Sequence, residues 1–407
     1  MSWLIKPGRG HKPDLVLMVA VGILMSIALV MMYSISPVLS YKLLGSTSRN
    51  FYFYGQLFST AVALVVGIIA SKIYFPNWKR WSVFILIVTI VALAIVMLPG
   101  LGFTKNGATR WIRLGPASFQ PAELLKLSVV IYLAAWFEAR RDRIANWREV
   151  LVPFSLMLAA AGFVIVVVQR DMGTMMVVAV SMIGLYFIAG SPLKQFGALM
   201  AASFAVGVAA IVAFPHRMER LLVFLDPAKD LTDTGYHINQ ALIAIGSGGV
   251  LGRGLGHSYQ IYGYLPEAAN DSIFAVIGEE FGLLGAIVII GLFMVVIQRG
   301  LLIAKGAPDT FSRLLAIGIT LWLGFQAIIN IAAMLSLIPL TGIPLPFISY
   351  GGSSLMLSLI GIGILLNISK YTDLTYINRE KTHANSSERR RVRRPHLANS
   401  GDAGRVA

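Results

Sequence analysis

Ten runs of predominantly apolar residues constrain this chain more than any other feature of its sequence. Each run is about 20 residues long, the length that an α-helix needs to cross a bilayer. A helix suits that environment because it satisfies its own backbone hydrogen bonds. Only 13% of the residues are charged, about half the share found in soluble domains. We therefore predict an all-α, polytopic membrane protein with ten transmembrane helices, at 15–34, 52–71, 81–99, 122–137, 150–168, 172–190, 195–214, 272–297, 312–338 and 353–369.

The basic residues predict which face of this protein lies in the cytoplasm. Lys and Arg are more than twice as frequent in the loops on the N-terminal side as in the opposite loops. Because basic loops stay cytoplasmic, and because the number of runs is even, both termini are predicted to be cytoplasmic. The net charge of +15 follows largely from this asymmetry, so we expect no nucleic-acid partner. The chain has no Cys, which excludes disulfides and thiolate metal sites.

We divide the chain into three regions. Residues 1–14 are predicted to be a cytoplasmic N-terminus, 15–369 the ten-helix transmembrane domain, and 370–407 a basic cytoplasmic tail with the composition of a disordered segment. The run Arg389 to Arg394 would lie against anionic lipid of the inner leaflet. A topology anchor with no specific partner explains that run equally well.

The longest connection, 215–271, joins the seventh and eighth runs and is predicted to be a large extracellular loop. A loop of this length usually carries function. Apolar residues at helical spacing predict two short amphipathic helices, within 218–230 and 236–249, that lie on or dip into the membrane. The glycines between 246 and 256 predict a flexible, close-packed turn. Their pattern lacks the Gly-Lys-Ser/Thr ending of a phosphate-binding loop, so no nucleotide site is expected.

A second long outer connection spans 101–120. Its aromatic residues Trp111 and Phe119 predict an interfacial segment at headgroup depth. Trp111 with Arg110 and Arg113 is suited to an anionic lipid headgroup, because Arg makes bidentate contacts to phosphate. Plain interfacial anchoring explains Trp111 as well.

Charged residues at membrane depth are costly, so each one is a functional hypothesis. Glu123 and Lys126 are three residues apart on the fourth helix and are expected to pair. Asp171 lies between the fifth and sixth helices, and Asp271 opens the eighth. A structural ion pair is the simpler interpretation of Glu123 and Lys126. For Asp271 the simpler interpretation is a helix N-cap, which is compatible with a chemical role.

Two further features stand out at membrane depth. Glu279 and Glu280 follow Asp271 on the same helix, about 12–13.5 Å farther along it at 1.5 Å per residue, and are expected to hydrogen-bond within the bundle. The segment 343–354, IPLPFISYGGSS, interrupts the pattern between the ninth and tenth helices. Irregular backbone at that depth is tolerated where it lines a cavity, and a plain hairpin turn is the alternative.

The motifs around these residues resemble those of the SEDS family (shape, elongation, division and sporulation), the FtsW/RodA group. They appear in family order as NGATRWIRLGPASFQPAELLKL, QRDMGT, FLDPAKD, IAIGSGG, YLPEAANDSIFAVIGEEFG and GIPLPFISYGGSS. The resemblance extends over nearly all ten helices. It implies a glycosyltransferase that polymerises lipid II into glycan strands at the outer face of the bacterial cytoplasmic (inner) membrane.

The resemblance also implies roles for individual residues. It places the family's catalytic aspartate at Asp271 and its cavity-lining charges at Glu123, Lys126 and Asp171. The same motifs extend the predicted substrate cavity to Arg110, Trp111, Arg113, Gln120, Glu267, Ser349 and Tyr350. Two motifs depart from the family pattern: Asn270-Asp271-Ser272 stands where Thr-Asp-Phe is usual, and Arg170-Asp171-Met172 stands where Pro-Asp-Leu is usual. Both aspartates are retained.

The implied chemistry fits these residue types. Glycosyl transfer needs one carboxylate to take a proton from the attacking hydroxyl, and Asp271 is predicted to be that base. The diphosphate leaving group needs positive charge, which Lys126, Arg110, Arg113 or a divalent cation could supply. We predict Mg²⁺ or Mn²⁺ with Asp271 and Asp171 as oxygen ligands.

Alternatives with other partners stay open from the sequence. The predicted partners are lipid II, membrane lipid, a class B penicillin-binding protein transpeptidase and, for an FtsW-like division enzyme, divisome proteins. A RodA-like elongation polymerase would use the same chemistry. A lipid II flippase or transporter, or a non-catalytic scaffold for a transpeptidase, would use the same fold; a transporter predicts charges through the full depth of the bundle.

Overall fold

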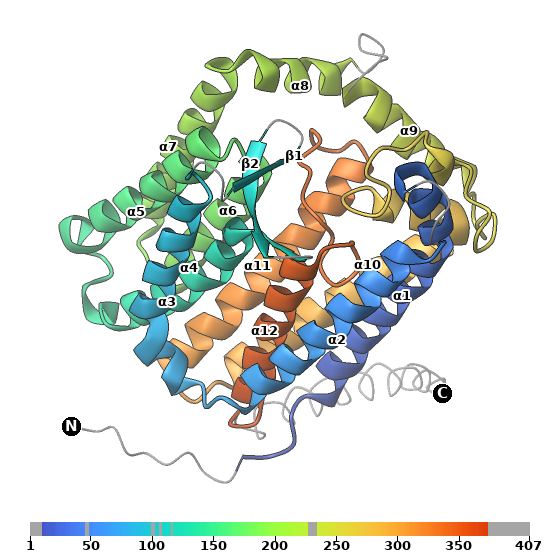
Figure 1. Ribbon diagram of the computed structural model, residues 1–407. Helices are drawn as coiled ribbons and strands as arrows, with labels where there is room; N and C mark the ends of the chain where they lie inside the picture. Colours follow the sequence, from blue (N-terminus) through green and yellow to red (C-terminus); the bar gives the residue numbers. More distant parts are fainter. Residues whose placement is uncertain are drawn as a thin grey trace, which may run out of the picture.

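The computed structural model describes residues 10–44, 49–98, 102–105, 108–114, 117–226 and 234–372. Helices run side by side across the molecule, and a small sheet and two shorter helices cover one end (Figure 1). We call this end the loop face; it carries residues 102–119, the helices of 215–247, and 248–272. The predictions for 1–9 and for 373–407, including the basic run at Arg389, lie outside the described residues.

All ten predicted runs are helical. Eight segments are long and apolar enough to cross a membrane, with the fifth run helical over Trp147–Val168. The other two are the shorter α6, which has 17 residues, and α4, which carries Glu123, Lys126 and Glu138. The helices are α1 (Leu15–Leu44), α2 (Phe51–Lys72), α3 (Pro76–Ile95), α4 (Pro121–Glu138), α5 (Val152–Gly162), α6 (Met172–Ile188), α7 (Leu193–Val212), α10 (Ile273–Lys305), α11 (Thr310–Met334) and α12 (Gly352–Ser369).

Helix α11 is the centre of the bundle. It packs against α10, α6, α4 and α12, and 78% of its most apolar stretch is buried, against 6% for α7. Both helices are apolar, so burial and not composition separates a core helix from one whose surface faces lipid. Most side chains on α11 are therefore closely packed.

The segment 101–120, which was predicted to be interfacial, contains a three-stranded antiparallel sheet. Strands β1 (Gly102–Lys105), β2 (Ala108–Leu114) and β3 (Ala117–Phe119) pair in chain order, with Phe103 opposite Trp111 and Ile112 opposite Phe119. The sequence did contain a signal for it. Asn106 and Gly107 separate β1 from β2, and Asn-Gly is a favoured pair in two-residue hairpin loops.

The large loop contains both predicted short helices, α8 (Pro215–Leu225) and α9 (Thr234–Ser247). Figure 1 shows them passing over the loop face from α7 toward the yellow segment that precedes α10. Residues 227–233, which include most of the FLDPAKD motif, lie outside the described part of the chain. A short 3₁₀ helix, η5 (Gln260–Tyr262), follows the glycine-rich segment.

Helix α10 is broken at Gly282, whose φ of 63° and ψ of −159° are not helical. The break leaves backbone N–H groups of the next turn without helical acceptors. Leu283 N–H donates instead to the carbonyl of Gly249 at 2.9 Å, and Leu284 N–H to the carbonyl of Val250 at 3.2 Å. The glycine-rich segment therefore completes the hydrogen bonding of α10.

This contact needs glycine because the two backbones nearly touch. A Cβ added to Gly248 would lie 2.0 Å from the carbonyl oxygen of Gly278, and one added to Gly252 would lie 2.2 Å from that of Glu280. Gly252 also has a φ of +81°, which disfavours any side chain. The predicted close-packed turn is confirmed, and hydrogen bonds to α10 hold it.

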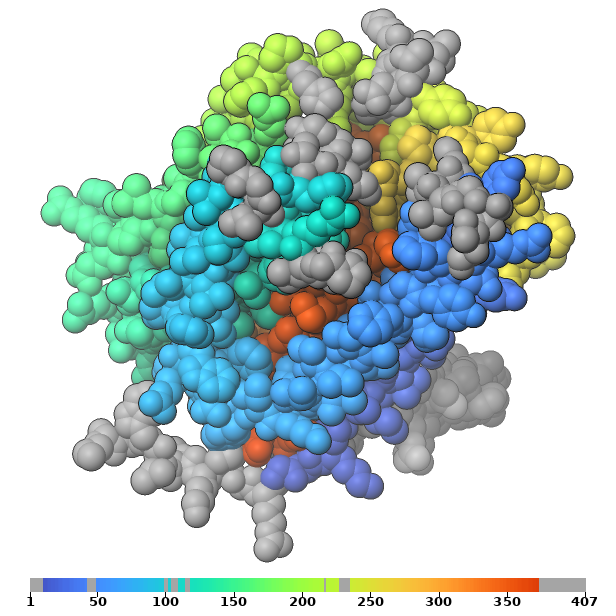
Figure 2. Space-filling view, in the orientation of Figure 1, coloured from blue at the N-terminus to red at the C-terminus, as the bar shows by residue number. Residues whose placement is uncertain are grey.

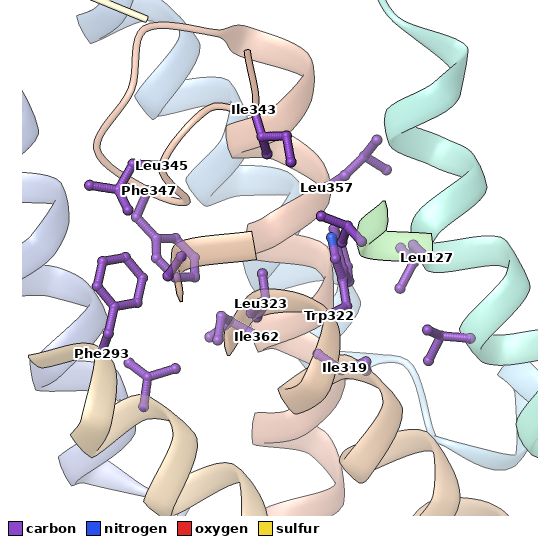
Figure 3. Close-up of a cluster of buried hydrophobic side chains, with 14 of the residues drawn as sticks. Leu127, Phe293, Ile319, Trp322, Leu323, Ile343, Leu345, Phe347, Leu357 and Ile362 are labelled. Carbon is purple, nitrogen blue, oxygen red and sulfur yellow. The ribbon is translucent and has the colours of Figure 1, made fainter. Parts of the chain in front are cut away.

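The segment between α11 and α12, residues 339–351, enters the bundle, and we call it the re-entrant segment. Figure 3 shows Ile343, Leu345 and Phe347 among buried side chains of α10, α11 and α12. The Phe347 ring stacks on Phe293 with centroids 6.4 Å apart. Because these side chains are buried in the core, a plain hairpin turn, the alternative interpretation, is wrong.

Candidate functional site

Asp271 lies directly before α10, beside the re-entrant segment. The N-cap of α10 is Ser272, so Asp271 does not cap this helix. The backbone carbonyl of Asp271 accepts a hydrogen bond from Asn330 Nδ2 at 2.8 Å. A Cβ placed on Gly342 would lie 3.8 Å from Asp271 Oδ2. Asp271 is 9% exposed and Gly342 is exposed, so the carboxylate lies next to an accessible point of the re-entrant segment.

The turn before Asp271 is tied to the end of the re-entrant segment. Ser349 Oγ donates to the carbonyl of Asn270 at 2.5 Å and accepts from Leu345 N–H at 2.7 Å. Tyr350 N–H donates to the carbonyl of Ala269 at 2.8 Å. Of the residues predicted for the cavity, Ser349 and Tyr350 thus lie beside Asp271. They hold the two residues directly before Asp271, and Asn330 holds Asp271 itself.

Glu267 and α9 complete the support of this turn. Glu267, at φ +46°, accepts a hydrogen bond from Asn270 Nδ2. Ser272 Oγ donates to the carbonyl of Pro266 at 2.9 Å and lies 2.6 Å from His237 Nε2 of α9. His237 was not predicted for the site; no sequence pattern distinguishes it from His257, whose ring Nδ1 lies 3.0 Å from the carbonyl of Leu255 in its own loop.

Glu123 and Lys126 form the predicted ion pair in the first turns of α4. Lys126 Nζ lies 2.7 Å from Glu123 Oε1, and each residue is 2% exposed. Lys126 Nζ also donates to Gln326 Oε1 at 2.7 Å and lies 5.9 Å from the centre of the Trp322 ring. The ammonium is thus paired and buried, the arrangement expected of a structural ion pair.

Asp171 caps α6 and is screened by Arg110. Its Oδ1 accepts from Thr174 N–H at 2.9 Å and its Oδ2 from Thr174 Oγ1 at 3.0 Å. Arg110 Nη1 lies 3.7 Å from Oδ2, and the same guanidinium donates to the carbonyls of Gln169 and Arg170 at 2.9 and 2.6 Å. Arg110 therefore joins strand β2 to the turn before α6.

The re-entrant segment links the surroundings of Asp171, Lys126 and Asp271. A Cβ on Gly173, two residues after Asp171, would lie 2.4 Å from the carbonyl oxygen of Thr341. Gln326 Nε2 donates to the carbonyl of Pro344 at 3.0 Å, which links the segment to Lys126. Residues 341–344 therefore contact the surroundings of Asp171, Lys126 and Asp271 in turn.

Two residues of this arrangement were not predicted: Gln326 and Asn330, one helical turn apart on α11. They are 0% and 1% exposed. The sequence shows that both are amides within a predicted transmembrane run, where buried polar groups require partners, but it does not show which partners they take.

The other predicted residues lie at the edge of the site. Gln120 precedes α4, and its N–H donates to Ser353 Oγ at 3.2 Å. Trp111 is half-buried in β2, and the exposed Arg113 has its Cζ 5.6 Å from the centre of the Phe103 ring. Figure 2 shows atoms of the re-entrant segment and α12, in orange and red, recessed between α2 and the sheet that carries these residues.

Glu279 and Glu280 bind the large loop. Glu279 accepts from Ser258 Oγ, from Tyr259 N–H at 2.9 Å and from Gln260 N–H at 3.4 Å. Glu280 accepts from Ser34 Oγ of α1 at 2.6 Å and from Gly256 N–H at 3.1 Å. The predicted hydrogen bond within the bundle holds for Glu280 alone. Together the two carboxylates fasten loop residues 256–260 to the first part of α10.

The described residues contain no group of three His, Cys, Asp or Glu side chains placed to hold a metal ion. The two oxygens of Asp171 already face Thr174 and Arg110. A cation held by protein ligands alone does not fit this donor set, because Mg²⁺ needs octahedral oxygen coordination.

Comparisons with known proteins agree with this architecture. Residues 14–374 match a family model described as "Cell cycle protein", for FtsW, RodA and SpoVE. The chain is 37% identical over 361 residues to stage V sporulation protein E of Bacillus subtilis (strain 168), covering 88% of this chain and 98% of that protein. It is 40% identical over 368 residues to the probable peptidoglycan glycosyltransferase FtsW of Thioalkalivibrio sp. (strain K90mix), covering 89% and 90%.

Solved structures share the fold. One, described as "Structural coordination of polymerization and crosslinking by a peptidoglycan synthase complex", aligns with a TM-score of 0.70 at 25% identity over 89% of this chain and 99% of that chain. The crystal structure of the rod shape determining protein RodA of Thermus thermophilus aligns with a TM-score of 0.64 at 25% identity, over 92% and 100%. The chain therefore belongs to the FtsW, RodA and SpoVE family of multi-pass membrane proteins.

Proposed function

We propose that this protein polymerises lipid II into glycan strands at the outer face of the bacterial cytoplasmic membrane. The observation that carries the proposal is the position of Asp271: a buried carboxylate beside the exposed Gly342, with hydrogen bonds from Asn330 to its own carbonyl and from Ser349 to that of the residue before it. Relatives named peptidoglycan glycosyltransferase support the class of reaction. The basic loops lie on the same side as the termini, which is expected to be cytoplasmic. The site lies at the opposite end of the bundle and would therefore face the exterior.

Asp271 is assigned the role of general base. Its carboxylate accepts the proton of the acceptor sugar's hydroxyl while that oxygen attacks the anomeric carbon of the donor sugar. The bond from the anomeric carbon to the lipid diphosphate breaks, and its electron pair leaves with the diphosphate. A diphosphate departs as a stable anion, so the second acid used by glycosidases is not required.

The leaving group requires positive charge, and the contacts favour the arginines of β2 over Lys126 for that role. The ammonium of Lys126 is neutralised by Glu123 and buried. The side chain of Arg113 is exposed. That of Arg110 is 31% exposed but also faces Asp171 at 3.7 Å, so Arg113 is the better placed of the two. Guanidinium groups bind diphosphate oxygens in pairs. Mg²⁺ or Mn²⁺ would supply further charge through the diphosphate and Asp271, since Mg²⁺ is usually held by one or two carboxylates plus phosphate.

A division role and a transpeptidase partner are part of the proposal. Several relatives are named FtsW, and one structural neighbour belongs to a peptidoglycan synthase complex. We therefore assign this chain to division, with a class B penicillin-binding protein and divisome proteins as partners. The transpeptidase that co-purifies with it tests this assignment, because an elongation enzyme would retain an elongation-type partner.

The activity test is polymerisation of lipid II by purified protein in detergent. Wild-type protein should form glycan strands, and Asp271→Asn should abolish them. The matched control is Asp142→Asn, because Asp142 is an aspartate with an 87% exposed side chain, paired with Arg141 on the opposite face. That control should retain wild-type activity. Strands formed by Asp271→Asn would refute the assignment of the base.

The same assay separates polymerisation from transport. In detergent there is no second compartment, so a flippase would yield no product. The buried carboxylates Glu123, Asp171, Asp271, Glu279 and Glu280 all contact or adjoin loop-face segments, whereas a transport path needs charges along its length.

A further inference from the structure

We infer that Asn330 of α11 is a positioning residue for this reaction. Its carboxamide fixes the backbone of Asp271 relative to the re-entrant segment. The inference deepens the proposed function and rests on it, because positioning matters only if Asp271 performs the chemistry.

Both hydrogens of the Asn330 amide are used. Nδ2 donates to the carbonyl of Asp271 at 2.8 Å and to the carbonyl of Ile343 at 2.7 Å. A carboxamide nitrogen has two hydrogens and a carboxylate has none. Asn330 is 1% exposed, so bulk water does not reach this contact to replace a lost donor. The Asn330 amide therefore uses both of its donors to join the backbone of Asp271 to the re-entrant segment.

The helix that carries Asn330 gives the contact its rigidity. α11 is the most buried of the candidate spans, and Gln326, one turn earlier, donates to the adjacent carbonyl of Pro344 at 3.0 Å. Gln326 in turn accepts from Lys126 Nζ. The two amides lie about 6 Å apart along the helix at 1.5 Å per residue. One turn of α11 therefore sets the spacing between Lys126 and the backbone of Asp271.

The sharpest perturbation is Asn330→Asp, which keeps the shape of the side chain, removes both donors when the new carboxyl is ionised and leaves a single O–H donor when it is protonated. A carboxylate oxygen would then face the two carbonyl oxygens and repel them. A misplacement of about 1 Å at a reacting group costs about 100-fold in rate. We expect kcat to fall by about that factor, with KM for lipid II unchanged, because Asn330 holds Asp271 and not the substrate.

The matched control is Asn367→Asp on α12. Asn367 is 2% exposed; its Nδ2 donates to the carbonyl of Ser71 at 2.9 Å and its Oδ1 accepts from Phe75 N–H at 3.0 Å. This amide lies at the end of the bundle away from the loop face. The control breaks a comparable buried contact, so it should lower the melting temperature while leaving kcat unchanged. A merely structural role for Asn330 predicts the same behaviour for both variants.

Backbone hydrogen exchange gives a readout besides activity. The rate of backbone amide hydrogen exchange in residues 269–275 and 341–347 should rise in Asn330→Asp. It should stay at the wild-type level in Asn367→Asp. Wild-type kcat in Asn330→Asp, or a raised KM with kcat unchanged, would overturn the inference. So would unchanged exchange in both segments.

A second variant covers the case in which Asn330→Asp does not fold. Asn330→Ser retains one donor and should reduce kcat less than the aspartate does, again with KM unchanged; wild-type kcat in the serine variant overturns the inference. Failure of the proposed function has a different signature, because neither wild-type protein nor Asn367→Asp would then form glycan, while the exchange result would still decide the role of Asn330.

Discussion

Replacing Lys126 with Met measures what the buried ion pair of Glu123 and Lys126 contributes to the stability of the fold. Lys126 Nζ lies 2.7 Å from Glu123 Oε1, and both residues are 2% exposed. Met fills nearly the same volume, and Gln326 Oε1 keeps its other donor, Trp322 Nε1, at 3.0 Å. The loss of stability therefore arises mainly at Glu123, whose buried carboxylate loses the cation with which it pairs. Removing one partner of a buried pair costs about 3–5 kcal/mol.

The assay is thermal unfolding of purified protein in detergent. At about 2 °C per kcal/mol for a large domain, the melting temperature should fall by roughly 6–10 °C. The double variant Glu123→Gln, Lys126→Met removes both charges and should melt above the single variant, since exchanging a buried pair for neutral groups is often without cost. A single variant that melts like wild-type protein, or a double variant that melts below the single one, would refute this reasoning.

Two further predictions test the packing of the large loop and the metal. Gly252→Ala should destabilise the fold by about 1–3 kcal/mol from overpacking, plus about 1–2 kcal/mol from its left-handed backbone, because the new Cβ would lie 2.2 Å from a carbonyl of α10. Gly207→Ala on α7, where a Cβ meets nothing within 4 Å, should melt at or above the wild-type temperature; equal melting of the two variants contradicts the packing argument. Chelation of divalent cations should stop polymerisation, and added Mg²⁺ or Mn²⁺ should restore it, as followed by glycan formation; full activity in chelator contradicts the metal prediction.

The sequence predicted the helices well because membrane spanning is a local property. Length and hydropathy of a run are visible without knowledge of its neighbours, and every predicted run is helical. The pair Glu123 and Lys126 was predictable for the same reason, since residues three apart on a helix share a face. The sheet at 102–119 was missed, although its Asn106-Gly107 signal was local, because the aromatic residues favoured an interfacial interpretation.

The break at Gly282 and the roles of Glu279, Gln326 and Asn330 could not be predicted. Glycine is common within membrane helices, so Gly282 differs in sequence from an unbroken position in no visible way. Glu279 binds a loop about twenty residues earlier, and Asn330 binds a carbonyl fifty-nine residues away. Such contacts depend on which backbone group the tertiary fold places next to a side chain.

By itself the sequence determined that the chain crosses a membrane many times, which of its carboxylates are candidates for chemistry, and the family whose motifs surround them. Only the tertiary structure decided that residues 341–344 enter the bundle and join the surroundings of Asp171, Lys126 and Asp271. The physical reason is that hydrophobicity is a property of each run alone, whereas the partner of a buried polar group is set by packing between segments far apart in the chain.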